Sequence, residues 1–203
     1  MRRLSIICGV AGLIILATTA TVGGLIYADY DHLTQFISEL GATGATTGLP
    51  VSLAFIASGS LLSLFWLSAM TQFPRTPPAV TGFVLSALNG LGLMFGGVFP
   101  CDFECAFTGH SQTAALHDAL SGVGYLSGIA GVFLIALSAR RWPRHRYLFP
   151  LGLVCAAPAA LAVGFIHPAF EWRGAAQRVV ELGLALFAAG IILALARDAR
   201  RAA

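Results

Sequence analysis

Six long apolar stretches constrain this chain more than any other feature. They cover about residues 5–26, 49–71, 79–99, 115–139, 148–166 and 175–196. The hydrocarbon core of a bilayer is about 30 Å thick, and a helix needs roughly 20 apolar residues to cross it. Each stretch is therefore predicted to be a transmembrane helix. Pro158 interrupts the short fifth stretch, so we expect a kinked or tilted helix there.

The composition supports this class of protein. Hydrophobic residues make up 57% of the chain and charged residues only 10%, whereas soluble domains carry about 25% charge. A chain with so few charges cannot cover a water-facing surface. We therefore predict an all-α, polytopic membrane protein, with residues 1–203 forming a single six-helix transmembrane domain. Nothing in the sequence resembles a basic nucleic-acid patch, so we expect no nucleic-acid partner.

The basic residues predict the orientation. All 12 are arginines, and all but Arg173 and Arg178 lie before the first stretch, after the sixth, or in the loops on the same side. By the positive-inside rule, both termini are cytoplasmic. We accordingly expect a multi-pass protein of the bacterial inner membrane. Met-Arg-Arg before an apolar run also fits a signal peptide, whose cleavage would leave five spans in the same orientation.

The three loops on the other, extracytoplasmic side carry nearly all the acids and histidines. Only Asp198 and His145 lie on the arginine-rich side. These loops are expected to converge over one mouth of the bundle and to form a polar site there. The site would face the extracytoplasmic side, above an interior with almost no ionisable groups.

The first of these loops contains the segment TQFISEL, residues 34–40. Apolar residues recur around it with helical spacing, at Leu33, Phe36, Ile37 and Leu40. This pattern predicts a short amphipathic helix lying at the membrane interface. Ser38 and Glu39 fall on its opposite edge. Glu39 either lies on a solvated edge or points across the mouth towards the second loop.

The second loop, FPCDFECAFTGHSQTAALHD at 99–118, is the richest in chemical groups. It holds Asp102, His110, His117 and Asp118. His117 and Asp118 fall inside the apolar boundary of the fourth stretch, where ionisable groups are costly and need a partner. Arg178 is expected below the interface in the sixth stretch. Its preferred partner is Asp102 or Glu39, although a local pair with Glu181 is an alternative.

The cysteines suggest a covalent link in the second loop. Cys101 and Cys105 flank two acids, and a CxxxC pair in a helix or tight turn has Cα atoms about 6 Å apart, within disulfide range. We predict a disulfide, as persists in oxidising compartments, with free thiols or metal ligation as alternatives. Cys8 and Cys155 lie within apolar stretches and are expected to be core residues.

Enzymatic chemistry at the mouth is one possibility. His110, His117 and His167 with an acid could supply three or four ligands to Zn²⁺. Such a site would resemble the alkaline-ceramidase-like membrane hydrolases, but this chain has six spans rather than seven and lacks a late HxxxH pair. Acid–base or acyl-transfer chemistry on a lipid without a metal is a further alternative.

Several short motifs resemble the DUF998 family of bacterial and archaeal membrane proteins. They are the segment YDHLTQFISELGATG after the first span, a GxFPCD-like end to the third, and the pairs Leu116-His117 and Gln177-Arg178. The CDFEC insertion departs from the pattern expected across the family. The resemblance implies a six-helix bundle and no particular reaction. It also implies functional positions at Ser38, Glu39, Asp102, His117 and Arg178.

A non-enzymatic role would require fewer chemical groups than an enzyme. The few ionisable residues within the spans argue against an ion-coupled transporter with a site at the membrane midplane. A rigid bundle with a polar cap is sufficient to bind lipid or to serve as an accessory subunit. We therefore predict lipid binding or an accessory role in a membrane complex, with membrane lipids and protein subunits as partners. A lipid-modifying enzyme of the outer leaflet is the alternative.

Overall fold

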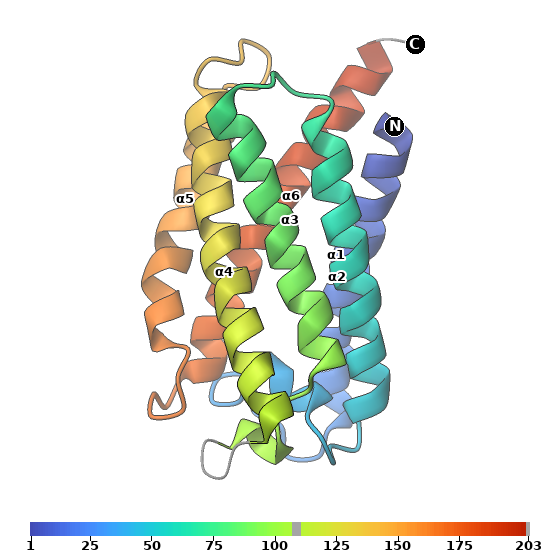
Figure 1. The fold of residues 1–203 in the computed structure, drawn as a ribbon, viewed down its shortest axis with the longest axis vertical. Helices are drawn as coiled ribbons and strands as arrows, with labels where there is room; N and C mark the ends of the chain where they lie inside the picture. Colours follow the sequence, from blue (N-terminus) through green and yellow to red (C-terminus); the bar gives the residue numbers. More distant parts are fainter. Residues whose placement is uncertain (107–110, 202–203) are drawn as a thin grey trace.

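Six long helices run side by side in the computed structural model, which describes residues 1–106 and 111–201 (Figure 1). Each is long and apolar enough to cross a bilayer, α5 together with the short 3₁₀ helix η3 (Val163–Phe165). The helices are α1 (Arg2–Ile26), α2 (Gly48–Met70), α3 (Pro77–Val98), α4 (Gln112–Ala139), α5 (Leu148–Ala162) and α6 (Arg173–Arg201). The six predicted spans and the all-α class are confirmed.

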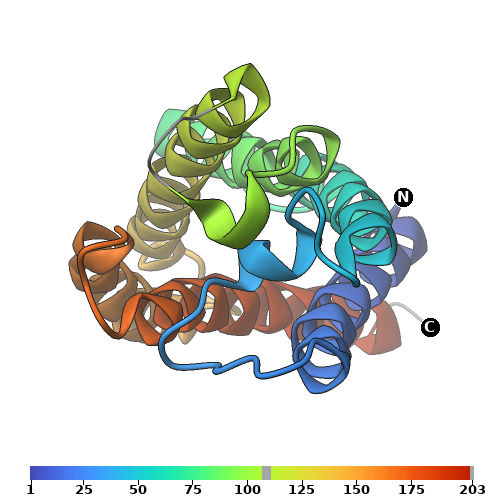
Figure 2. The ribbon, with the colours of Figure 1, turned by 90° about the horizontal axis from the view of Figure 1, so that it is seen from below.

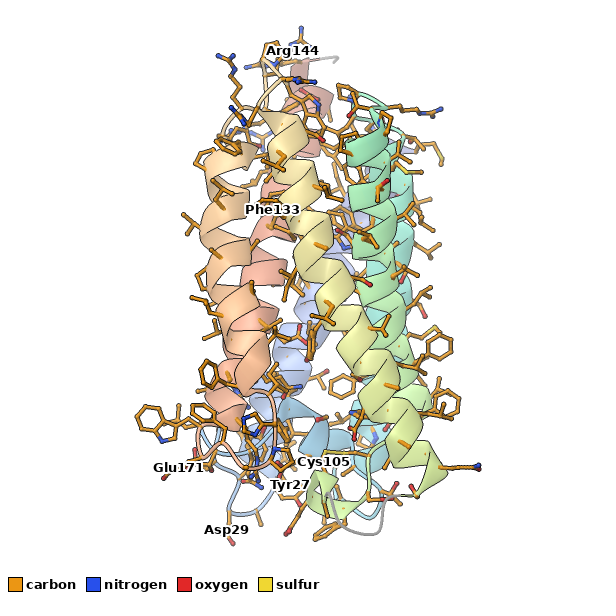
Figure 3. All side chains as sticks on the ribbon, turned by 60° about the vertical axis from the view of Figure 1, so that its left-hand side comes forward. Tyr27, Asp29, Cys105, Phe133, Arg144 and Glu171 are labelled. Atoms are coloured by element: carbon orange, nitrogen blue, oxygen red, sulfur yellow. A yellow bond between two sulfur atoms is a disulfide. The ribbon has the colours of Figure 1, made fainter. Side chains whose placement is uncertain are left out.

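The two ends of the bundle differ in their loops. Both termini lie at one end, here called the terminal end (Figure 1). The opposite end, here called the mouth end, carries residues 27–47, 99–106 and 166–172 among those described. Seen from the mouth end, the 3₁₀ helices η1 (Ile37–Gly41) and η2 (Phe103–Cys105) lie inside the ring of long helices (Figure 2). Figure 3 shows Arg144 at the terminal end and Asp29 and Glu171 at the mouth end.

Helices α2, α3 and α4 pack backbone against backbone. A Cβ atom added to Gly59 of α2 would lie 2.5 Å from the carbonyl oxygen of Gly90 in α3. A Cβ added to Gly92 of α3 would lie 2.8 Å from the Cα of Gly124 in α4. Only glycine fits at such contacts, and in lipid small residues allow helices to approach this closely.

Aromatic rings fill the bundle towards the terminal end. Trp66 packs on Phe65 at 4.7 Å between ring centroids and on Phe187 at 6.5 Å. Phe73 stacks on Trp142 at 5.0 Å, in the loops that close this end. All five side chains are buried. This half of the interior is therefore closely packed.

The prediction of an amphipathic helix at the membrane interface over residues 34–40 is wrong in the type of helix and in its location. Only Ile37–Gly41 is helical, as a 3₁₀ turn. Phe36, Ile37 and Leu40 are buried, and Ile37 and Leu40 pack with Leu16 of α1 and Phe55 of α2. Three of the four apolar residues therefore point into the bundle, because the mouth end leaves room between the helices for them, whereas Leu33 is exposed.

Candidate ligand-binding cavity

A cavity of about 240 Å³ runs into the bundle beneath η1 and η2. Its apolar wall comes mainly from α1 and α2, with Leu16, Phe55 and Leu62, and it reaches Trp66 near the terminal end. Its polar residues come mainly from η1, α3, α4 and the start of α6: Ser38, Ser86, Asn89, His117, Asp118, Ser121, Tyr125, Gln177 and Glu181. One space thus has both an apolar and a polar wall.

His117 is held in place by the end of α3. The side chain is buried, and its Nδ1 lies 2.8 Å from the Phe99 carbonyl oxygen and 3.2 Å from that of Gly96. Both neighbours can only accept, so Nδ1 carries the proton. These contacts satisfy carbonyl groups that the end of a helix leaves without partners. In the neutral ring, Nε2 then keeps its lone pair.

A directed chain of hydrogen bonds links η1 to the interior. The backbone N–H of Ile37 donates to Oε1 of Gln177 at 2.6 Å. Nε2 of Gln177 donates to the hydroxyl of Tyr125 at 2.9 Å, and that hydroxyl donates to Oε1 of Glu181 at 2.8 Å. A loop, α4 and α6 are thereby joined, and the chain ends on an acid within a membrane span.

Glu39 faces α6 rather than the second loop or solvent. It is 1% exposed and accepts hydrogen bonds from the Phe36 N–H and from Nε2 of Gln35, both at 2.9 Å. Arg173 lies 3.7 Å from its Oε1. Burial raises the pKa of the Glu39 carboxyl, and the two hydrogen bonds and Arg173 oppose this rise without cancelling it. Neither predicted placement of Glu39 is therefore correct.

Arg178 binds the first loop instead of an acid. Its guanidinium donates to the Tyr30 hydroxyl at 2.8 Å and to the Gln35 carbonyl at 3.1 Å, and it lies 2.9 Å from Nδ1 of His32. The predicted pairing of Arg178 with Glu39 or Asp102 is therefore wrong. Arg173, one and a half turns nearer the mouth, reaches Glu39 because it projects towards η1.

Asp102 supports the beginning of α4. Its carboxylate accepts hydrogen bonds from the Ser111 hydroxyl at 2.7 Å and from the Ser111 N–H at 2.9 Å. Ser111 in turn accepts from the Ala114 N–H at 3.1 Å and caps the helix. Asp102 therefore helps to orient the helix that carries His117 and Asp118.

The predicted disulfide joins Cys101 and Cys105, whose Cα atoms are 5.0 Å apart. Oγ of Ser38 lies 3.5 Å from Sγ of Cys105, and the N–H of Thr43 donates to the Cys101 carbonyl at 2.9 Å. The disulfide turn thus packs on the first loop over the cavity. Cys8 and Cys155 are free and buried, as expected of core residues.

The proposed metal ligands are not assembled in the described part of the chain. His110 lies outside the described residues. His167 is exposed beside Phe170, while His117 is buried in the cavity wall with Nδ1 bound to carbonyl groups. Among residues 1–106 and 111–201, no three His, Cys, Asp or Glu side chains form a group able to hold a metal ion.

Of the five predicted site residues, the structure places Ser38 and His117 in the cavity wall. The other three residues instead hold the structure around the cavity in place. Glu39 and Arg178 connect the first loop to α6, and Asp102 supports the start of α4. The prediction did not include Glu181 or Asn89, which line the cavity within α6 and α3. A signal for Glu181 was present, because an acid inside an apolar stretch is a candidate functional residue by default.

One family model, described as "Protein of unknown function (DUF998)", matches residues 10–197. No curated protein matches the chain. No solved structure matches it either.

Proposed function

Because the chain belongs to the DUF998 family, whose description states no activity, we propose a function from the cavity itself. The protein binds a lipid or similar amphipathic molecule inside the bundle. The polar part of the ligand contacts Ser38, His117 and Asp118, and its hydrocarbon lies against α1 and α2. The observation that carries this proposal is the single cavity with one polar and one apolar wall.

A second observation supports access from the bilayer. An apolar groove runs along the outer surface between α4 and α5, lined by residues such as Leu126, Phe133 and Ala160. Val163 lines both this groove and the central cavity. In Figure 3, Phe133 projects from α4 on this side of the molecule. A hydrocarbon chain that lies in this groove is therefore adjacent to the cavity while it is still in the bilayer.

The arginine distribution supports an orientation in which the mouth end faces the outer leaflet. Arginines concentrate at the terminal end, and the positive-inside rule favours a cytoplasmic location for such an end. The disulfide at the mouth end fits an oxidising compartment. On this orientation, in the cytoplasmic membrane of a bacterium, the ligand comes from the outer leaflet.

Native mass spectrometry of the protein purified in mild detergent tests lipid binding. Ser121 lines the cavity on α4, and Ser121→Trp would place an indole ring there. Val123 is 59% exposed on the same helix, so Val123→Trp is the matched control. We expect bound lipid on the wild type and on Val123→Trp, and a loss of about tenfold or more in Ser121→Trp. Equal lipid occupancy in both variants would contradict the proposal.

His117 supports a second candidate, acid–base chemistry on the bound lipid. Its Nδ1 proton is committed to two carbonyl groups, so Nε2 is the nitrogen able to take a proton. His117→Asn keeps an N–H donor for the Phe99 carbonyl and removes that base. We expect this variant to retain lipid but to lose turnover of lipid esters or amides, measured by lipid mass spectrometry. Absence of turnover by the wild type would leave binding as the function.

A further inference from the structure

The carboxyl group of Glu181 lines the cavity from within α6. Its Oε1 accepts a hydrogen bond from Tyr125. In the part of the chain that the structure describes, no arginine or histidine lies within ion-pair distance of this carboxyl. An acid at this depth is costly unless a partner compensates it. The cavity is where such a partner can bind.

The hydrogen-bond chain fixes Glu181 as an acceptor. The Ile37 N–H can only donate, so it sets the orientation of the Gln177 amide, which donates in turn to Tyr125. Tyr125 then has one hydrogen, and that hydrogen points to Glu181. Every donor in the chain is directed towards the carboxyl. A ligand donor is therefore the group that complements this carboxyl in its ionised form, through the remaining Oε2.

Two further polar side chains lie on the cavity wall. The Ser86 hydroxyl is buried without a hydrogen-bond partner among the described residues, in a side chain that is 1% exposed. The Asn89 side chain is half-buried and lies against Gly128, where α3, α4 and α6 meet beside Leu184. Buried polar groups within a span are normally paired. Their oxygens are available to accept hydrogen bonds from a ligand.

We infer that Glu181, Asn89 and Ser86 form a subsite for the protonated amine of an amphipathic ligand. An ammonium group has three donors and no acceptor, which matches a carboxylate, an amide oxygen and a hydroxyl oxygen facing one cavity. It also neutralises the acid, which a hydroxyl group does not. This inference rests on the proposed function and specifies the chemical class of its ligand.

Three probes of equal chain length test the charge preference: octylamine, octanol and octanoate. Their binding to the detergent-solubilised full chain at neutral pH is measured by isothermal titration calorimetry. We expect octylamine to bind about tenfold or more tightly than octanol, and octanoate to bind most weakly. Wild-type protein alone decides this comparison, so it holds even where a variant fails to fold.

Glu181→Gln is the diagnostic variant, and Glu171→Gln, which replaces an exposed loop acid, is its matched control. We expect Glu181→Gln to lose the preference for the amine and to bind octanol within about twofold of wild type. Glu171→Gln should retain the preference. Equal binding of amine and alcohol by the wild type, or a preference that survives in Glu181→Gln, would overturn this inference alone. Failure of all three probes to bind would overturn the proposed function itself.

Discussion

The two halves of the bundle fill their interiors differently. Towards the terminal end, large rings such as Trp66 and Phe187 pack against one another and leave little space. Towards the mouth end, the inward positions of α3 and α4 carry small or polar residues such as Asn89, Gly96 and Ser121, and a cavity remains. All six helices are apolar enough to cross a membrane. The size of the inward side chains, rather than hydropathy, decides where the bundle is open.

The covers of the two ends also differ. At the terminal end, the short connections carry Phe73 and Trp142, which stack, and His145 lies 3.0 Å from Asp198 of α6. At the mouth end, a disulfide closes a turn within the second loop, this turn packs on the first loop, and the first loop is bonded to α6. The closed half is thus held mainly by ring packing, whereas the open half is held by polar contacts. The two halves should respond to different perturbations.

The largest effect is expected from opening the closed half. Trp66→Ala removes a buried ring that contacts Phe65, Phe83 and Phe187 and forms the inner end of the cavity. Truncation of a buried Trp to Ala costs about 3–5 kcal/mol. Thermal unfolding in detergent should show a correspondingly lower Tm. Trp172→Ala, at a position that is 60% exposed, is the control and should change the Tm little.

A smaller loss of stability is expected when the disulfide at the mouth end is removed. The double variant Cys101→Ser/Cys105→Ser removes a disulfide that closes a very short loop, worth about 2 kcal/mol by chain entropy. We expect a lower Tm and weaker retention of lipid. Addition of a reductant should lower the Tm of the wild type but leave the variant unchanged. Equal sensitivity of both proteins to reductant would contradict a stabilising role for this disulfide.

Glu39 should make the stability of the open half depend on pH. Its pKa is raised by burial in the folded state, so folding favours the protonated form. That contribution is complete below the unfolded pKa and is lost as the pH rises through the folded pKa. Relative to Glu39→Gln, wild type should therefore lose stability as the pH rises above the ordinary pKa of a glutamate. A Tm difference between the two proteins that stays constant with pH would refute this.

The smallest effect is expected from the contact between His145 and Asp198 at the closed end. Asp198→Asn removes the charge opposite His145 but retains an oxygen that can accept its hydrogen bond. Partly exposed pairs of this kind contribute about 1 kcal/mol or less. The Tm should therefore fall by no more than a few degrees. A loss as large as that of Trp66→Ala would mean that polar contacts, not ring packing, hold this end.

Hydropathy was sufficient to predict the six helices, because each must bury its own backbone hydrogen bonds across the bilayer. The disulfide was predictable because Cys101 and Cys105 are close in sequence. The bond from Ile37 to Gln177 was not, since these residues are 140 positions apart and no local pattern joins them. For the same reason, the sequence alone did not distinguish Arg173 from Arg178 as the partner of Glu39.

The position of η1 inside the bundle also could not be predicted from the local sequence pattern. Its apolar stripe fits a membrane surface and a bundle interior equally well, and only the space left between the helices decides between them. Glu181 could have been recognised as an unusual acid in an apolar stretch. Its connection to Tyr125, however, depends on how α4 and α6 face each other.

The backbone contacts between α2, α3 and α4 limit how the binding site can change. At Gly59 and Gly92 the neighbouring chain leaves no volume for even one methyl group, so these three helices cannot move closer, and a larger residue would force them apart. Helix α1 differs, because a Cβ added to its Gly9 would meet side-chain atoms of Phe65 and Ile192 rather than backbone. Relatives with wider or narrower ligands would therefore be expected to differ in α1, while the three-helix unit stays constant.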